Sequence, residues 1–250
     1  MRYLGGKKKI GKEIASVLSK YGDPDKVDGY IEPFCGSLGV MVHMVDKGYK
    51  TCKAYDSCKD LILLWKALKA DKLKFPKSVS ERTWLRYKND KTPSAMRAFI
   101  GFGCSFGGIW FSGYAQKYYK NYENRTPALI ESIQSTKKLI PFIKKINTIG
   151  CKDYKQHHLK NFLIYCDPPY SNTSGYKAVN SFNNNEFWDK VREWSKNNIV
   201  IVSEYTAPKD FKCIWTKKRK IGMSRYLSTK SVKDNLYMYK PLYIKLIKNK

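Results

Sequence analysis

The chain has 250 residues, with 48 lysines and arginines against 21 aspartates and glutamates and a formal net charge of +27. Its apolar content of 42% and aromatic content of 14% are sufficient for a packed core, which excludes a disordered polyelectrolyte. Because no apolar run reaches about 18 residues and no signal-like segment opens the chain, we expect a cytoplasmic protein that does not enter a membrane. The charge predicts a polyanionic partner.

The cysteines and histidines predict no metal centre. Seven cysteines are scattered along the chain without a C-x-x-C pair, and only three histidines are present. We therefore expect reduced thiols and no structural metal, with the adjacent His157 and His158 at the surface.

Short apolar runs alternate with amphipathic stretches, which is typical of an α/β sheet. In the first part of the chain they predict a helix over 9–19, a strand over 27–34, a helix over 40–48, a strand over 51–55 and a helix over 60–70. In the second part they predict a strand over 161–166, a helix over 184–196, a strand over 198–203 and an antiparallel pair formed by 235–239 and 242–247.

The spacing of these elements predicts an inserted subdomain. One βαβ unit of about 30 residues cannot fill the interval before the strand near Asn161. We assign 71–140 to the insertion, and 1–70 with 141–250 to one sheet domain. Within the insertion, residues 99–122 carry nine aromatic residues interleaved with glycines, a pattern that favours a turn or hairpin over a helix. These rings either form a satellite core or stack on bases.

The segment Asp167-Pro168-Pro169-Tyr170 follows a predicted buried strand and is the sharpest chemical signal. The two prolines end the strand, so the Asp167 carboxylate and the Pro168 carbonyl can face a cleft and accept hydrogen bonds from an exocyclic amine. Tyr170 can stack on the ring that carries the amine. A plain strand-ending turn is the alternative.

Two further segments predict a ligand site beside it. Glu32-Pro33-Phe34-Cys35-Gly36-Ser37-Leu38-Gly39 places glycines between a strand and a helix, where a ligand can approach the backbone closely. Asp56, about twenty residues further on, suits a ribose diol, although it could simply cap the next helix. Tyr3-Leu4-Gly5-Gly6-Lys7 can bend around a small ligand or form a basic tail.

Taken in chain order, from Tyr3 through Glu32–Gly39 and the insertion to Asp167-Pro168-Pro169-Tyr170, the segments resemble the Dam-type DNA adenine-N6 methyltransferases with a DPPY motif, the D12 class. Asp56 with Asp60-Leu61 is similar to the D-x-x-x-D-L segment of that family, and Phe106 to Tyr114 resembles its recognition hairpin, especially in phage-encoded members. The resemblance implies a Rossmann-like class I methyltransferase sheet with a mostly helical target-recognition insertion. It also implies a site-specific enzyme that transfers methyl from S-adenosylmethionine to a flipped adenine in double-stranded DNA.

Residue by residue, the resemblance implies three groups. Cofactor binding falls to Tyr3, Lys7, Glu32, Phe34, Gly36, Asp56 and Asp167. The catalytic segment is Asp167, Pro168, Pro169 and Tyr170. DNA binding falls to Phe106, Trp110, Phe111, Tyr114 and Lys117.

Two positions depart from the family pattern. Leu38 and Gly39 stand where many relatives have glycine and a small residue, which could tighten the methionine pocket. Phe111 falls near the arginine that reads guanine in GATC-specific members, so GATC recognition is not expected unless Lys117 or Lys120 substitutes. The target sequence, any role in restriction-modification and the oligomeric state stay open.

Several alternatives share part of this pattern. The same acceptor pair would serve N4 of cytosine, an RNA adenine or a protein amide, and an inactive DNA-binding relative would keep the fold.

The charge is concentrated in three segments: residues 1–20 carry +5, the insertion carries +8 and residues 206–250 carry +11. We therefore expect strongly salt-dependent binding to DNA.

Overall fold

The computed structural model describes residues 1–115, 127–169, 182–221 and 230–248. It contains a seven-stranded sheet in the order β3-β2-β1-β4-β5-β7-β6. The strands are β1 (Gly29–Glu32), β2 (Cys52–Asp56), β3 (Thr148–Cys151), β4 (Phe162–Cys166), β5 (Ile199–Glu204), β6 (Phe211–Ile221) and β7 (Lys230–Tyr239). The first five are parallel, and β7 runs antiparallel to both β5 and β6. This order confirms the predicted Rossmann-like sheet.

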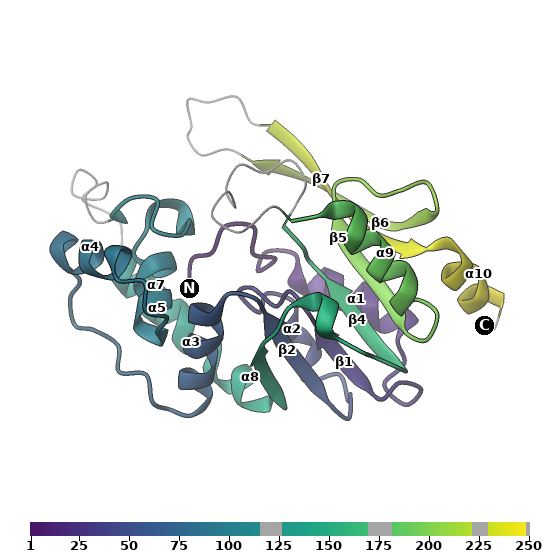
Figure 1. Ribbon diagram of the computed structural model, residues 1–250, viewed down its shortest axis with the longest axis horizontal. Coiled ribbons are helices and arrows are strands. Elements are labelled where there is room, and N and C mark those ends of the chain that lie inside the picture. Colours follow the sequence, from purple (N-terminus) through teal and green to yellow (C-terminus); the bar gives the residue numbers. More distant parts are fainter. Residues whose placement is uncertain (116–126, 170–181, 222–229, 249–250) are drawn as a thin grey trace.

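Helices cover both faces of the sheet and form a group at one end of the molecule, to the left of the sheet in Figure 1. The helices associated with the sheet are α1 (Gly11–Tyr21), α2 (Met41–Met44), α3 (Lys59–Lys69), α8 (Ile140–Lys145), α9 (Asn184–Trp194) and α10 (Lys240–Lys248), with a short turn η2 (Tyr154–Gln156). The group at the end comprises α4 (Glu81–Asn89), α5 (Ala95–Gly103), η1 (Phe106–Gly108) and α7 (Ala128–Lys137). The described part of 71–140 is thus mostly helical, as predicted.

Two apolar clusters lie on opposite faces of the sheet. One gathers buried side chains of α1, α2, α3 and α5, including Ile14, Leu64 and Phe99. The other packs Phe187 and Val191 of α9 against the strands. Successive strand residues point to opposite faces, so strands this apolar need a cover on both sides.

The pair predicted for 235–239 and 242–247 is wrong in its second member. Residues 240–248 form helix α10, which begins with Pro241 in its first turn, a position where the missing N–H costs nothing. The partner of β7 is instead β6, a strand that the sequence analysis missed because its lysines and arginine interrupt the apolar pattern. The short edge strand β3 was missed as well.

Two further expectations are corrected. Residues 99–103, expected in a turn or hairpin, belong to helix α5, whereas Ser105 and Tyr114 further on form the antiparallel bridge of a hairpin. A Cβ on Gly101 would lie 2.5 Å from Trp110 and 2.7 Å from Phe111. The glycine is therefore used for close helix packing. His157 is buried, at 3% exposure, with its ring 4.5 Å from that of Tyr55, whereas His158 is exposed.

Candidate active site

The carboxyl ends of β1, β2 and β4 carry the predicted acidic residues Glu32, Asp56 and Asp167 at one edge of the sheet. Strands β1 and β4 are neighbours, while the chain runs outward from them in both directions to β2 and β5. Ligands bind at such a topological switch point, since the loops diverge there and leave a crevice.

Asp167 is paired with the opening segment of the chain. Its Oδ1 lies 2.7 Å from the Lys7 ammonium, and the two side chains are 19% and 5% exposed. The Lys7 ammonium also lies 3.4 Å from the Gly5 carbonyl oxygen. The ion pair brings together two predicted motifs that are 160 residues apart.

The rest of the Asp-Pro-Pro-Tyr segment is described only in part. Pro168 is buried and Pro169 is half-buried, directly after the last residue of β4. Tyr170 lies outside the described residues. The predicted pairing of a carboxylate with a rigid carbonyl at Asp167 and Pro168 stays a prediction.

The N-terminal segment packs on the loop after β1 instead of forming a free tail. A Cβ added to Gly6 would lie 2.7 Å from the Ser37 hydroxyl, and one added to Gly36 would lie 3.4 Å from the Tyr3 ring. Tyr3 therefore covers Gly36, and the two predicted cofactor segments form one surface.

Hydrogen bonds fix both the N–H and the carbonyl of Gly36. Its N–H donates to Asp56 Oδ2 at 3.0 Å, and its carbonyl accepts from the Trp65 indole N–H at 3.0 Å. Its φ of +45° lies in the left-handed region that favours glycine. The loop conformation is thus fixed by groups on β2 and α3.

Asp56 acts both in this loop and at the start of α3. Its Oδ1 accepts from the Cys58 N–H at 2.9 Å, and burial raises the pKa of its carboxyl, opposed by these amide hydrogen bonds. A carboxylate offers about four acceptor positions, and the amides of Gly36, Ser57 and Cys58 act on this one, so about one remains for a ligand hydroxyl. The helix-capping alternative is not borne out, because the N-cap of α3 is Cys58 and Asp56 accepts from the N–H of that residue instead of one inside the first turn.

Glu32 points into the core. It is 2% exposed and accepts a 2.7 Å hydrogen bond from the Tyr30 hydroxyl. Burial raises the pKa of Glu32 to about 8. Phe34 is half-buried and packs at 5.2 Å from Tyr154 and 5.7 Å from Phe187, so its loop is anchored on the α9 face.

The departure at Leu38 has a structural consequence away from the ligand surface. Leu38 adopts a left-handed φ of +62° and its side chain is fully buried in the cluster with α1 and α2. Such a conformation costs a non-glycine residue about 1–3 kcal/mol. The burial of the side chain offsets that strain.

The predicted DNA-binding aromatic residues differ in exposure. Phe111 is 6% exposed and packs at 5.4 Å from Trp84, while Trp110 packs at 4.7 Å from Phe102. The Tyr114 hydroxyl donates to the Val79 carbonyl. Phe106, by contrast, is 41% exposed. Lys117 lies outside the described residues, as does Lys120.

A buried ion pair, which the sequence analysis missed, holds these rings. Arg97 Nη1 lies 2.8 Å from Asp60 Oδ2, and its guanidinium stacks over Trp110 at 4.9 Å and Phe111 at 5.5 Å. Asp60 belongs to the D-x-x-x-D-L segment, so that segment ties α3 to the aromatic hairpin. The residues around Arg97 in the sequence form no pattern that predicts its contact with Asp60.

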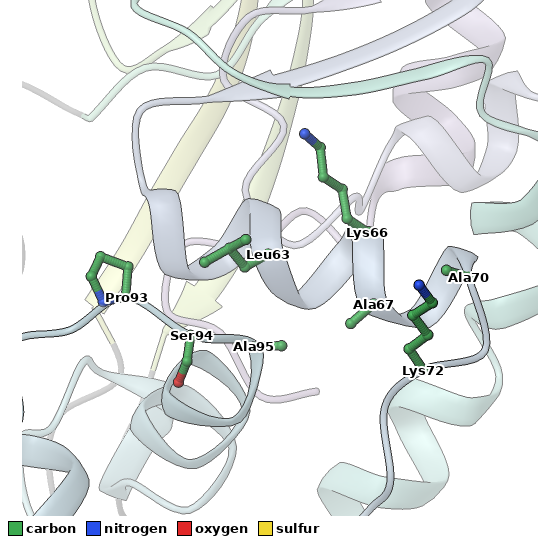
Figure 2. A pocket seen from close by; sticks show the side chains of 8 residues that line it. All are labelled: Leu63, Lys66, Ala67, Ala70, Lys72, Pro93, Ser94 and Ala95. Carbon is green, nitrogen blue, oxygen red and sulfur yellow. The ribbon is translucent and has the colours of Figure 1, made fainter.

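Figure 2 shows the side chains that line a pocket beside α3. It is lined by Leu63 and Ala67 of α3 and by residues 93–95, with Lys66 and Lys72 at its margin. None of the predicted site residues lines it. The chemistry is therefore assigned to the sheet edge.

Within the described ranges, no group of three or more His, Cys, Asp or Glu side chains is arranged to hold a metal ion. No described helix has the length and apolar character needed to cross a membrane.

Comparison with solved structures gives matches at low identity. One is a Haemophilus influenzae protein described as a methylase, with a TM-score of 0.35, 9% identity and coverage of 90% of this chain and 88% of that chain. Another is the Escherichia coli methyltransferase yhhF, with a TM-score of 0.36, 9% identity and coverage of 96% and 98%. Comparison with curated proteins finds no match.

Comparison with family models is informative for the first part of the chain. Residues 3–94 match the model described as D12 class N6 adenine-specific DNA methyltransferase. The matched stretch contains Tyr3, Lys7, Gly36 and Asp56, and it ends before Asp167. Residues 3–94 are therefore similar to the D12 class N6 adenine-specific DNA methyltransferases, a family of S-adenosylmethionine-dependent enzymes.

Proposed function

We propose that this protein transfers a methyl group from S-adenosylmethionine to the exocyclic N6 of an adenine flipped out of double-stranded DNA. The observation that carries the proposal is the 2.7 Å ion pair between Lys7 and Asp167. It joins the family-matched segment to the Asp-Pro-Pro end of β4, at the switch point of the sheet.

The cofactor surface is formed by the N-terminal segment and the loop after β1. Tyr3 and Gly36 form its apolar wall, and the remaining acceptor position of Asp56 suits a ribose hydroxyl. When bound there, S-adenosylmethionine supplies an electrophilic sulfonium methyl. The chain needs to position the nucleophile and exclude water.

Asp167 would bind the target amine. An adenine amine is a weak nucleophile because its lone pair is delocalised into the ring. Hydrogen bonds from its two N–H groups to the Asp167 carboxylate and the Pro168 carbonyl would favour a tetrahedral nitrogen with its lone pair directed at the methyl group. The N–C bond would form as the S–CH3 bond breaks, S-adenosylhomocysteine would be the leaving group, and the surplus proton on the nitrogen would pass to water. Tyr170 would stack on the base and offset about 1–3 kcal/mol of the cost of unstacking it.

Lys7 sets a condition on this step. Its ammonium already occupies Asp167 Oδ1, so the incoming amine either uses Oδ2 or displaces the lysine. In the first case Lys7 orients the carboxylate. In the second the ion pair opens only when a base enters.

Replacing Asp167 by alanine tests the proposal. We expect Asp167→Ala to lose methyl transfer to DNA by at least about 10³-fold, because both the amine acceptor and the Lys7 partner are removed. Nonspecific DNA binding should be retained, since the basic surfaces are unchanged. Incorporation of tritiated methyl groups and filter binding measure the two properties.

Asp25→Ala is the matched control, because Asp25 is an exposed loop residue away from the strand ends. Digestion of the methylated DNA, with mass identification of the nucleoside, distinguishes N6-methyladenine from N4-methylcytosine, and an RNA substrate tests the RNA alternative. Turnover by Asp167→Ala at the level of Asp25→Ala would refute the assignment. Calorimetry with S-adenosylmethionine separates an active enzyme from an inactive DNA-binding relative.

A further inference from the structure

The β6–β7 hairpin extends past the end of the sheet on the side of the candidate active site. The last residue of β5, Glu204, pairs with Asn235 of β7, yet β7 begins five residues earlier, at Lys230. Strand β6 continues alongside it, with pairs from Phe211↔Tyr239 to Ile221↔Lys230. Figure 1 shows the two strands projecting beyond the others.

The strand registers give the direction and scale of this projection. Cys166 of β4, Val202 of β5 and Tyr237 of β7 form one row across the sheet, and Asp167 lies one position beyond it. At about 3.3 Å per residue and 4.8 Å per strand, Lys233 lies roughly 10 Å beyond Asp167 and roughly 10 Å to its side. This separation is comparable to the width of a DNA major groove, about 12 Å.

The projecting part is basic. Residues 211–239 contain eight lysines and arginines and one aspartate, including the run Lys217-Lys218-Arg219-Lys220. Lys217 pairs with Glu13 of α1, and Asp234 opposite it is buried. Lys217 is thus neutralised on its face of the hairpin.

On the other face, Lys218 stands directly opposite Lys233, and both are exposed. Like charges in direct cross-strand contact destabilise a hairpin. Neither lysine has an ion-pair partner among the described residues. A pair of this kind is compatible with stability when a polyanion binds it.

We infer that the face of the β6–β7 hairpin carrying Lys218 and Lys233 binds the phosphate backbone of duplex DNA beside the target base. This inference rests on the proposed function for its partner. It assigns to the sheet domain a second DNA contact, separate from the 71–140 insertion. The duplex is held between the two, with the strand end at Asp167 in the middle.

The test is the salt dependence of binding to a G·C-only duplex, which offers no adenine to methylate. Each phosphate contact contributes a slope of about −0.9 to the plot of log K against log salt. We expect Lys218→Gln with Lys233→Gln to reduce this slope by about 2 and to weaken binding roughly tenfold near 0.1 M salt. Lys218→Arg with Lys233→Arg should keep the wild-type slope, since both charges remain.

Lys50→Gln with Lys160→Gln is the matched control. Both are exposed lysines that precede β2 and β4, at the opposite edge of the sheet, and the change in net charge is the same. This variant should bind DNA as the wild type does. Equal affinity for S-adenosylmethionine in all variants shows that the sheet is intact.

The outcomes separate the inference from the proposed function. The inference is overturned if the wild type methylates DNA but Lys218→Gln with Lys233→Gln keeps the wild-type slope. It is also overturned if Lys50→Gln with Lys160→Gln weakens binding as much as that variant does. If the wild type neither binds the duplex nor methylates adenine, the proposed function itself fails.

Discussion

Single side chains carry the chemistry of this site through their burial as much as through their identity. Lys7 and Asp167 pair with one another at 5% and 19% exposure, and Glu32 is 2% exposed below them. A charged group so enclosed is stable only with a partner or in its neutral form. Lys7 and Asp167 are paired with one another, whereas Glu32 is in its neutral form.

The neutral form of Glu32 gives the stability a distinct pH dependence. Because its pKa is about 8 in the folded protein and 4.5 in the unfolded chain, its contribution is fully present below pH 4.5 and is lost as the pH rises towards 8. The loss by pH 7 is on the order of 3 kcal/mol. Glu32→Gln keeps an oxygen that accepts from the Tyr30 hydroxyl and never ionises.

Glu32→Gln should therefore be more stable than the wild type at pH 7–8, and the difference should shrink to near zero at about pH 4.5. Urea unfolding across this range measures it. Glu193→Gln, on an exposed side chain, serves as the control for the loss of one negative charge. A constant difference between Glu32→Gln and the wild type at all pH values would contradict a neutral Glu32.

At the scale of elements, helix α5 and the aromatic hairpin after it form one packed unit. Gly101 lets the rings of Trp110 and Phe111 contact the helix backbone, while Arg97 stacks on both rings and pairs with Asp60 of α3. Of the two roles considered for these aromatic residues, packing in a satellite core fits Phe111. Phe106 keeps the exposure that stacking on a base requires.

Gly101→Ala should lower the free energy of unfolding by about 1–3 kcal/mol, because the new methyl group overlaps both rings. The midpoint of urea unfolding measures the loss. Gly103→Ala in the same helix is the comparison: its Cβ would meet Ser132 at 3.0 Å, a tight contact but longer than those at Gly101, and alanine favours the helix by about 1 kcal/mol, so we expect a smaller loss. Equal losses in the two variants would show that the rings do not select glycine at position 101.

At the scale of the whole molecule, the first seven residues connect the helical group to the sheet. Arg2 pairs with Glu131 of α7, and the Leu4 N–H donates to the Gly108 carbonyl at 3.1 Å. The same segment then places Tyr3 on Gly36 and Lys7 on Asp167. The chain start lies between the two groups in Figure 1.

Gly108→Ala should therefore disturb the cofactor surface from a distance. A Cβ there would lie 2.6 Å from the Tyr3 nitrogen and 2.8 Å from the Arg2 carbonyl carbon, so the N-terminal segment has to shift. We expect S-adenosylmethionine to bind roughly tenfold more weakly, about 1.4 kcal/mol, as measured by calorimetry.

Gly107→Ala separates this coupling from backbone strain. Gly107 also has a positive φ, +66° against +69° for Gly108, but its Cβ would meet only the Ile109 side chain, at 3.6 Å. Strain is thus similar in the two variants and the contact with the N-terminal segment is not. If both variants bind the cofactor equally weakly, the coupling through that segment is refuted.

The sequence by itself determined the local features of this protein. Apolar runs ending in polar turns predicted β1, β2, β4 and β5, and short motifs predicted the residues at their ends, because strand burial and turn chemistry depend on neighbouring residues. The charge predicted the class of partner. The motifs also indicated the family, which the match over residues 3–94 supports.

Only the tertiary structure decided which distant groups meet. The Lys7–Asp167 pair, the Arg97–Asp60 pair and the burial of Phe111 and His157 depend on contacts between segments far apart in the chain, which leave no periodic signal. The same holds for β6, whose run of cations forms a strand because β7 pairs with it, and for α10, whose apolar residues pack as a helix instead. Long-range packing overrides local preference wherever it buries apolar surface or satisfies a charge.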